Sequence, residues 1–337
     1  MTKLSIGIVG CGAATTSYYV PASKKYAHQI NELFLVDSHS GRAQEARAAI
    51  GYGEVVADYH DILDKVDGAI IVLPNKLHYP VAMDFLKKGV HVLCEKPLAE
   101  KTAEARALIE MASEQKVGLC LNNTRRMFPN FSKTREIVKN GQLGKIKSIS
   151  YIEGLTFGWP SATGFYVDPS VTSRGILNDV GPHILDQICW WLDGKPTLKS
   201  YQDDSYGGPE SVCEIEAEYH SCKINIFLNR LNDLKTTFVI EGEKGSLKGE
   251  LFQWHKLELT DNNGQTSTIK LKVPYKTYPA HVLPIFENFL KLIQGEAEPL
   301  VSGIQVLPSI EWIEECYQNR KRFQMTWNEN LEKILEN

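Results

Sequence analysis

The sequence predicts an α/β protein of two domains, a first domain built on a parallel sheet and an α+β second domain with an open, mostly antiparallel sheet. The chain has 337 residues, enough for about two domains of ~150 residues each. Strand-like and helix-like segments alternate over the first third of the chain. After about residue 122, segments in which apolar and polar residues alternate one by one take over. We therefore place the first domain at residues 1–121 and the second at residues 122–337.

Five short apolar runs, each bounded by turn residues, predict the strands of the first domain. They lie at Ile6–Val9, Leu33–Val36, Ala69–Leu73, Val90–Leu93 and Val117–Leu121. Strands buried on both faces show this pattern, as in parallel sheets covered by helices. Apolar residues at helical spacing predict helices over Tyr79–Lys88 and Thr102–Gln115, which we expect to pack on this sheet.

One-by-one alternation predicts the strands of the second domain. In Val212–Tyr219, apolar residues alternate with glutamates, which is typical of a strand with one buried face. Similar stretches continue at Lys223–Leu231, Thr236–Ile240 and Leu257–Val273, the last with the turn signal Asn262-Asn263-Gly264. Helices are predicted near Phe131–Lys139, Asp179–Leu192, Leu283–Ile293 and Ile304–Arg322. The sheet of this domain is therefore expected to be covered mostly on one side.

The balance of charge excludes several classes of partner. Lysine and arginine number 37 against 41 aspartate and glutamate residues, a formal net charge of −4, so no overall basic field attracts nucleic acid or an anionic membrane. The first residues lack the apolar core and cleavage site of a signal peptide, and no window approaches the ~20 apolar residues of a membrane helix. Seven cysteines without a CxxC pair are typical of reduced thiols. We expect a cytoplasmic protein whose partners are small molecules and other protein chains.

A glycine turn directly follows the first strand, in the string Gly10-Cys11-Gly12-Ala13-Ala14-Thr15. The first glycine permits the tight turn, and the second lets the main chain approach a pyrophosphate. The helix that begins at Ala13 and Ala14 adds N–H donors and the positive end of its dipole. Thr15 stands where the usual fingerprint has its third glycine. We predict a dinucleotide-binding Rossmann domain whose two glycines and two alanines contact the pyrophosphate.

An acidic residue at the end of the second strand supports this prediction. The carboxylate of Asp37 can accept both hydrogen bonds of an adenosine ribose diol, and it repels a 2′-phosphate. This favours NAD over NADP. Ser38, His39, Ser40 and Arg42 follow at once and could cradle a 2′-phosphate if Asp37 turned away, so NADP remains the alternative. We count Asp37, Ser38 and Arg42 among the cofactor-binding residues.

Three further segments complete a recognisable set of motifs. Leu73-Pro74-Asn75-Lys76-Leu77-His78 ends the Ala69–Leu73 strand, Cys94-Glu95-Lys96-Pro97-Leu98 ends the next strand, and Gly175–Asp186 contains the D-x-G-x-H string of Asp179, Gly181 and His183. Together with the glycine turn, these segments resemble the glucose-fructose oxidoreductase / inositol dehydrogenase / rhizopine catabolism (Gfo/Idh/MocA) family. The resemblance spans nearly the whole chain.

The resemblance implies a fold and a reaction. The fold is a Rossmann domain followed by an open-faced domain that binds substrate and whose sheet is often used in dimer or tetramer contacts, so a homodimer or homotetramer is expected. The reaction is hydride transfer between a nicotinamide and a secondary alcohol, commonly on a sugar, cyclitol or nucleotide sugar. An enzyme of this kind is an NAD(P)-dependent dehydrogenase or ketoreductase.

The resemblance also implies roles for individual residues. Lys96 is expected to contact the reacting hydroxyl and the nicotinamide side of the cofactor, and His183 to act as the acid/base, held or assisted by Asp179. Within the motifs that precede them, four residues are expected to lie at the cofactor: Pro74, Asn75, His78 and Glu95. Glu95 is also expected to anchor the end of its strand.

Physical chemistry supports these roles independently. Oxidation of an alcohol carbon requires a base for the hydroxyl proton, and a group that titrates near neutrality, such as His183, suits this task. Asp179 and His183 lie four residues apart on one helix face, with Pro182 in the first turn, where proline is tolerated. The helix dipole disfavours the imidazolium and Asp179 favours it, and the sequence leaves open which effect dominates. Lys96 follows a strand at its carboxyl end, where ligands bind in such sheets, and Pro97 permits a cis peptide bond there.

Other residues near these motifs have two interpretations. Arg125 and Arg126 resemble a family Arg-Arg-Phe segment that borders the substrate, although a solvated loop fits them nearly as well. Tyr166, in the stretch 159–168, is a candidate for a substrate-covering loop. Asp186 is expected to be a packing residue. We assign Arg126 and Tyr166, with Lys96, Asp179 and His183, to the substrate.

No cluster of histidine, cysteine and carboxylate residues has the spacing of a metal site, so no metal is expected. Two other functions remain open. Some members of the resembled family are NAD-dependent glycosidases that oxidise their substrate transiently, and others bind a dinucleotide as sensors without catalysis. Retention of Lys96, Asp179 and His183 argues against a sensor, whereas the sequence separates the glycosidase poorly.

Overall fold

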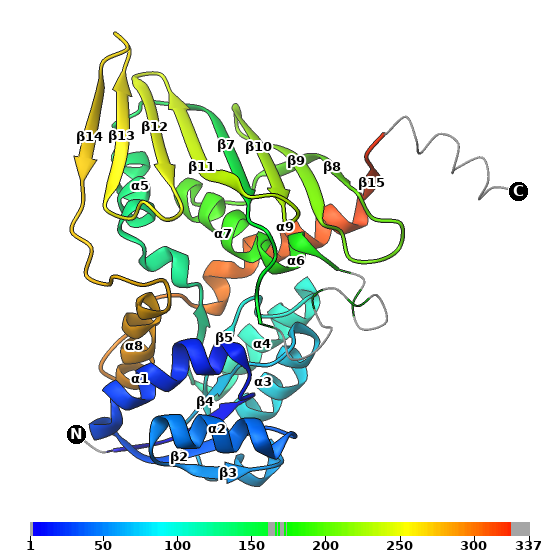
Figure 1. The fold of residues 1–337 in the computed structure, drawn as a ribbon, viewed down its shortest axis with the longest axis vertical. Coiled ribbons are helices and arrows are strands. Elements are labelled where there is room, and N and C mark those ends of the chain that lie inside the picture. The colour runs from blue at the N-terminus through cyan, green and yellow to red at the C-terminus, as the bar shows by residue number, and fades with distance from the viewer. Residues whose placement is uncertain (1–2, 161–165, 167, 169–171, 173, 325–337) are drawn as a thin grey trace, which may run out of the picture.

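The computed structural model describes residues 3–160, 166, 168, 172 and 174–324. Of the candidate loop 159–168, it therefore describes Trp159, Pro160, Tyr166 and Asp168, and the remainder lies outside the described residues. The described chain forms two sheets, one at each end of the molecule, with helices packed on them (Figure 1).

The first sheet has six parallel strands in the order β3-β2-β1-β4-β5-β6. Their bounds are β1 Leu4–Val9, β2 Ile30–Val36, β3 Glu54–Val56, β4 Gly68–Ile71, β5 His91–Glu95 and β6 Leu119–Asn122. The helices between them are α1 Val20–Lys25, α2 Ser40–Ile50, α3 His78–Lys87 and α4 Thr102–Gln115. The direction of strand order reverses between β1 and β4, and ligands of such sheets bind at this switch, beyond the carboxyl ends of the strands. The predicted parallel α/β domain is confirmed.

A helix from late in the chain also covers this sheet. In α8, Leu283–Ile293, the buried Phe286 and Phe289 belong to the same apolar cluster as Ile6 of β1. The fit is close, because a Cβ added to Gly68 of β4 would lie 2.5 Å from the Cδ1 atom of Ile293. The chain after residue 122 thus supplies a covering layer to the first sheet, and α8 lies beside α1 (Figure 1).

The second sheet has nine strands in the order β14-β13-β12-β11-β7-β10-β9-β8-β15. Their bounds are β7 Ile146–Gly154, β8 Thr197–Asp203, β9 Val212–Tyr219, β10 Cys222–Asn229, β11 Leu234–Gly242, β12 Gly245–Glu250, β13 Lys256–Asp261, β14 Thr266–Lys270 and β15 Lys321–Arg322. Strand β7 pairs with β10 in parallel, as β15 does with β8, and the other pairs are antiparallel. The predicted mostly antiparallel sheet is confirmed.

Helices cover one face of this sheet and leave the other open (Figure 1). They are α5 Pro129–Lys139, α6 Ile176–Asp179, α7 Gly181–Leu192 and α9 Gly303–Gln318. The alternation of β9 matches this arrangement, since Cys213, Ile215 and Ala217 are buried while Glu214 and Glu216 are exposed. No helix among the described residues has the length and apolar composition needed to cross a membrane.

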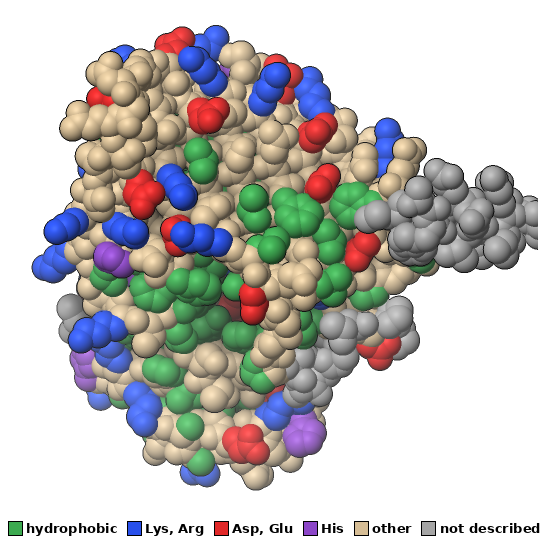
Figure 2. All heavy atoms as spheres, turned by 45° about the horizontal axis from the view of Figure 1, so that its top comes forward, with side chains coloured by type: hydrophobic (Ala, Val, Ile, Leu, Met, Phe, Trp, Pro, Cys, Tyr) green, Lys and Arg blue, Asp and Glu red, His purple; other side chains and the backbone are tan. Residues whose placement is uncertain are grey.

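The surface carries charges of both signs. Figure 2 shows acidic and basic side chains dispersed over the face in view, while hydrophobic side chains gather in a band across its middle. This distribution matches the small net charge of −4.

Candidate active site

The glycine turn after β1 is tight at its first glycine and open at its second. Gly10 has a φ of 97°, and a Cβ there would lie 2.1 Å from the carbonyl oxygen of Val72, so only glycine fits. A Cβ on Gly12 would meet nothing within 4 Å, so the main chain is open on this side. Thr15, in place of the third glycine, is fully buried and donates its hydroxyl to the Gly10 carbonyl at 2.5 Å. The threonine therefore braces the turn from within instead of filling the open side.

Asp37 lies beside this turn, held by several donors. Its carboxylate accepts hydrogen bonds from the main-chain N–H of Cys11 at 2.9 Å and of His39 at 2.8 Å, and from Arg42, whose Nη2 lies 2.8 Å from Oδ1. Burial raises the pKa of Asp37, but the hydrogen bonds from Arg42 and the two amides outweigh it and lower the pKa. The carboxylate is thus ionised and fixed toward the glycine turn, and its role as ribose ligand stays a prediction.

Lys96 connects the two sheets. It follows the last residue of β5, and the Lys96–Pro97 peptide bond is cis. Its ammonium donates to the carbonyl oxygen of Asp179 at 2.7 Å and to the Oδ1 atom of Asp179 at 3.0 Å. Burial disfavours the ammonium, but the charge of Asp179 outweighs it and raises the pKa of Lys96. Lys96 is therefore a fixed cation at the carboxyl end of the first sheet.

His183 lies one turn beyond Asp179. Asp179 ends α6, and α7 begins at Gly181 with Pro182 in its first turn, so the predicted continuous helix is divided at Val180. The Nδ1 atom of His183 is buried and has no hydrogen-bond partner in the part of the chain that the structure describes. Burial and then the positive charges of Arg125 and Lys96 lower the pKa of His183 well below its ordinary value. The sequence left open whether the helix dipole or Asp179 dominates the charge state of His183. Burial, the largest effect, keeps this imidazole neutral.

A buried carboxylate in the connection between β8 and β9 holds the segment that leads to Asp179. Glu210 accepts hydrogen bonds from the main-chain N–H groups of Gly175 and Leu177, both at 3.0 Å, and from the Tyr317 hydroxyl at 2.8 Å. A Cβ on Gly175 would lie 1.9 Å from the carbonyl oxygen of Glu210, so the two segments touch at the main chain. Glu210 thereby fixes the start of α6, whose last residue is Asp179. Sequence reasoning missed it, because no local motif surrounds it.

Arg125 forms a buried ion pair close to His183. Its Nη1 and Nη2 atoms lie 2.6 Å and 2.7 Å from the two carboxylate oxygens of Glu153, and both side chains are buried. Its Nε donates to the hydroxyl of Tyr278 at 3.4 Å. Arg125 therefore places a fixed positive charge near the imidazole, a role that the sequence did not assign.

Arg126, predicted to contact the substrate, is held by a different carboxylate. Its Nε and Nη2 atoms pair with the two oxygens of Asp186 at 2.8 Å and 2.6 Å, and Gln305 accepts from its Nη1 at 3.2 Å. Both charged side chains are at most 3% exposed. The geometry favours a structural role for Arg126, and Asp186 occupies the packing position expected of it.

We expect Arg126→Ala to lower the free energy of unfolding by about 3–5 kcal/mol, because Asp186 would remain buried without its partner. The double variant Arg126→Met with Asp186→Leu should recover most of this loss, since it removes both charges. Urea denaturation of the purified variants measures the effect. The control is Arg106→Ala, which breaks the ion pair with Glu311 at a side chain that is 60% exposed and should cost less than about 1 kcal/mol. Equal losses for Arg126→Ala and Arg106→Ala would contradict the prediction.

The remaining predicted cofactor residues lie at the ends of β4 and β5. The imidazole nitrogens of His78 lie 2.6 Å from the Pro97 carbonyl oxygen and 2.7 Å from the Leu73 carbonyl oxygen, and the side chain is fully buried. Its ring is thus engaged by the main chain, which favours a structural role. Glu95 accepts from the Tyr19 hydroxyl at 2.9 Å, and burial raises its pKa. Asn75 begins the short turn Asn75–Leu77 directly after Pro74.

Tyr166 lies near the charged pair. Burial raises its pKa to about 12, and the charges of Lys96, Asp179 and Arg230 all act on its hydroxyl. The main-chain oxygen of Tyr166 accepts a hydrogen bond from Arg230 at 3.0 Å. The charges of Lys96 and Asp179 thus reach Tyr166, and its assignment to the substrate stays a prediction.

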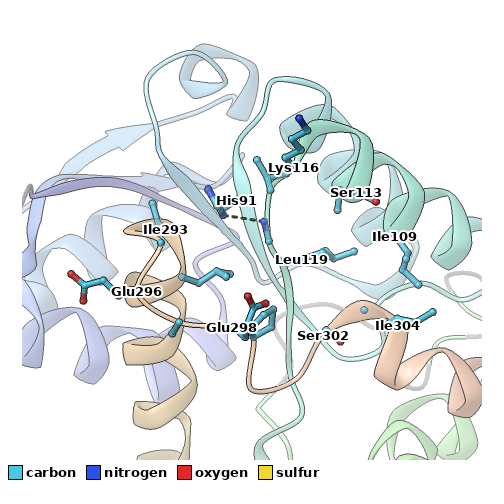
Figure 3. Close-up of a pocket in the computed structure, with 18 residues that line it drawn as sticks. His91, Ile109, Ser113, Lys116, Leu119, Ile293, Glu296, Glu298, Ser302 and Ile304 are labelled. Atoms are coloured by element: carbon cyan, nitrogen blue, oxygen red, sulfur yellow. Dashed lines mark hydrogen bonds between the residues drawn. The ribbon is translucent and has the colours of Figure 1, made fainter.

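A cavity of about 760 Å³ lies away from these residues (Figure 3). It is lined by His91 at the start of β5, Leu119 at the start of β6 and the segment around Glu296 and Ile304. Lys96 follows the opposite end of β5, so this cavity is separate from the candidate site.

Comparisons with known proteins identify the family and the fold of the chain. The model of an oxidoreductase family with an NAD-binding Rossmann fold matches residues 4–123, and the model of the GFO/IDH/MocA C-terminal domain matches residues 131–248. Levoglucosan dehydrogenase of Pseudarthrobacter phenanthrenivorans is 24% identical over 326 residues, covering 83% of this chain and 82% of that protein. D-glucoside 3-dehydrogenase of Escherichia coli is 27% identical over 293 residues, covering 80% and 82%.

A solved structure shares the fold. The structure of levoglucosan dehydrogenase in complex with NADH and levoglucosan superposes with a TM-score of 0.82 at 16% identity, covering 94% of this chain and 97% of that one. At this identity the likeness establishes the architecture of both sheets.

Proposed function

The chain belongs to the Gfo/Idh/MocA family of oxidoreductases, and from this premise we propose that it transfers a hydride between NAD and a secondary hydroxyl or ketone of a sugar, cyclitol or nucleotide sugar. The resemblance inferred from the motifs is confirmed, and the protein is an NAD-binding oxidoreductase. One observation carries the proposed site: Lys96 and Asp179 meet at 3.0 Å beyond β5, with a neutral His183 one turn away. The two sugar dehydrogenases among the relatives support the substrate class.

The residues of the first sheet fit the dinucleotide. The open side of Gly12 and the N–H groups of Ala13 and Ala14 would hold the pyrophosphate, and the fixed carboxylate of Asp37 would hold the adenosine ribose. When bound, NAD accepts or returns the hydride.

The chain's own residues manage the proton and the charge on the substrate oxygen. An ammonium has three N–H donors, and Asp179 accepts at two positions, its carbonyl and its carboxylate. The third N–H of Lys96 is thus available to the reacting oxygen. In oxidation, neutral His183 accepts the hydroxyl proton while Lys96 stabilises the negative charge that develops on the oxygen. In reduction, the imidazolium of His183 returns the proton.

The experiment that tests this function follows the near-ultraviolet absorbance of reduced nicotinamide. Purified protein is supplied with NAD or NADP and a panel of sugars, cyclitols and nucleotide sugars. Reduction of NAD that matches a ketone product supports the proposal. Release of an aglycone from a glycoside with no net change in the cofactor would favour a glycosidase, and NADH binding without turnover across the panel would favour a sensor.

We expect Asp37→Ala to weaken binding of NADH by on the order of 10-fold to 100-fold, because hydrogen bonds to a charged group contribute about 1.5–3 kcal/mol. Binding of NADPH should weaken less or improve, because Arg42 is released from its ion pair and can meet the 2′-phosphate. Titration of both reduced dinucleotides measures the two dissociation constants. The matched control is Asp58→Ala, an exposed aspartate that caps a short helix of the same sheet region. Equal losses for NADH and NADPH would count against Asp37 as the ribose ligand.

We also propose that the chain forms a homodimer or homotetramer through the open face of the second sheet. On that face Ile152 of β7 is 41% exposed, although it lies at the centre of the sheet. Leu234 at the start of β11 is 36% exposed. Apolar side chains at the middle of an open sheet face favour an interface. Light scattering should give two or four chains for the wild type and a smaller assembly for Ile152→Lys.

A further inference from the structure

A buried arginine beside the candidate site has an unusual set of partners. Arg230 directly follows β10 and is 7% exposed. Its Nη1 donates to the main-chain oxygen of Tyr166 at 3.0 Å, but its Nε and Nη2 are buried without a hydrogen-bond partner among the residues that the structure describes. No carboxylate of the described residues forms an ion pair with Arg230. Arg125 and Arg126, by contrast, each bind one carboxylate through two neighbouring nitrogens of the guanidinium.

The edge left without a partner, formed by Nε and Nη2, also binds carboxylates at two other arginines of this molecule. Arg126 meets Asp186 through its Nε and Nη2 atoms, and Arg42 meets Asp37 through the same two atoms. These two N–H groups are parallel and match the oxygens of a carboxylate or a phosphate. Because a guanidinium keeps its proton in proteins, its charge cannot be relieved by deprotonation.

The main chain and an aromatic ring fix this guanidinium in place. The ring of Phe157 lies 5.4 Å from its central carbon atom, and the N–H of Phe157 donates to the Arg230 carbonyl at 3.0 Å. The N–H of Arg230 donates in turn to the Ser211 carbonyl at 3.0 Å. The guanidinium is therefore positioned before any ligand arrives, which lowers the entropic cost of binding.

Tyr166 places Arg230 relative to the reacting groups. The main chain of Tyr166 contacts Arg230, and its hydroxyl lies within the electrostatic range of Lys96, Asp179 and Arg230 alike. Arg230 therefore lies beside a tyrosine whose hydroxyl also interacts electrostatically with Lys96 and Asp179. Lys96 and Arg125 are already neutralised by Asp179 and Glu153, which leaves Arg230 as a cation near the site without a protein counter-charge among the described residues.

We propose that Arg230 binds an anionic group of the substrate, a carboxylate or a phosphate, so that the enzyme acts on an acidic sugar or cyclitol. This inference rests on the proposed function, because it assumes that the substrate's reacting hydroxyl lies at Lys96. The anion would then be held at Arg230, and the reacting hydroxyl would lie between Lys96 and His183.

The test compares three pyranoses that differ only at C6: D-glucose, D-glucuronate and D-glucose 6-phosphate. Calorimetric titration into NADH-saturated protein measures binding without turnover, and NADH fills the pyrophosphate site. The wild type should bind one of the two anions at least tenfold more tightly than glucose, and the better anion identifies carboxylate or phosphate. Arg230→Gln should abolish the preference for the anion and leave glucose binding unchanged. Arg230→Lys should retain part of this preference. The control Arg106→Gln, at an exposed site, should retain all of it.

Other outcomes overturn the proposal. Equal binding of all three sugars by the wild type, or an equal loss of all three in Arg230→Gln, would mean that Arg230 only holds the Tyr166 segment. If no sugar binds, inorganic phosphate is titrated into the NADH-saturated protein. It should bind the wild type and not Arg230→Gln, and absence of phosphate binding to the wild type rejects the site. The same titrations in His183→Ala distinguish the proposal for Arg230 from the proposed role of His183. The anion preference should persist in His183→Ala whether or not His183 is the acid/base, because Arg230 is unchanged.

Discussion

Replacing His183 with alanine is expected to lower turnover by about 10²–10⁴-fold, the range that a positioned acid/base contributes. The reason is the position of the imidazole, which is neutral, lies one turn beyond Asp179 and has a buried Nδ1 without a partner among the described residues. The affinity for NADH should stay within a few-fold of the wild type, because the glycine turn and Asp37 are untouched. Steady-state kinetics on the sugar identified in the panel, with fluorescence titration of NADH, measures both effects.

The pH dependence of the wild type follows from the same imidazole. Burial and the charges of Arg125 and Lys96 lower the pKa of His183, so oxidation should persist below the ordinary histidine range and fall only as the pH drops through the lowered pKa. This acid limb should be absent from the residual activity of His183→Ala. The control is His60→Ala, whose side chain is 57% exposed, and which should leave both turnover and the pH profile unchanged. Turnover of His183→Ala within tenfold of the wild type would refute the assignment.

Replacing Lys96 with methionine should lower kcat by on the order of 10²–10³-fold, the cost of losing one donor to a developing oxyanion. The stem of the side chain is kept, so the loss reflects the ammonium. Asp179→Asn should be less severe, because the Asp179 carbonyl still accepts from Lys96 at 2.7 Å. The double variant should be no slower than Lys96→Met alone, since the two residues act as one unit.

The control for this series is Lys101→Met, in the same connection but with a side chain that is 64% exposed. It should retain wild-type kcat and KM. Additive losses in the double variant, or a kcat for Lys96→Met above one tenth of the wild type, would show that the ammonium does not act on the reacting oxygen.

Local patterns predicted much of the fold. The helices Thr102–Gln115 and Leu283–Ile293 and the strand Val212–Tyr219 have the predicted bounds, because one apolar stripe or one alternating face continues over each whole element. Strand β3 was missed since only three residues form it, and β15 since only two do.

Strand β7 was missed for a more informative reason. Exposed and buried positions alternate along β7, but near its end the apolar Ile152 is exposed and the charged Glu153 is buried. Glu153 is buried because Arg125 pairs with it, and Ile152 lies on the open face. Local rules fail here because distant groups determine both environments, as is typical of functional positions.

The residues of the candidate site also fall into those that local patterns predict and those that they do not. Lys96, Asp179 and His183 belong to contiguous motifs, and Asp37 is expected at the end of the strand that follows a glycine turn, so the sequence alone was enough to predict them. Glu210 and Arg230 have no such local signal, because their roles depend on partners from distant segments. The motif around Arg125 pointed to the substrate, but it did not reveal the buried pairing with Glu153. His78 illustrates the converse, since its motif pointed to the cofactor and the fold engages its ring with two carbonyl groups.

The packing of α8 on the first sheet constrains how this protein can be divided or recombined. A fragment that stops after β6 would expose the surface that Phe286 and Phe289 cover, including the notch at Gly68 shaped around Ile293. A chimera that exchanges the second sheet and its helices with those of a relative must therefore keep α8 matched to the first sheet. A cut at a single point of the sequence cannot separate the two sheets with their covering layers intact, because Leu283–Ile293 follows the second sheet in the chain and packs on the first.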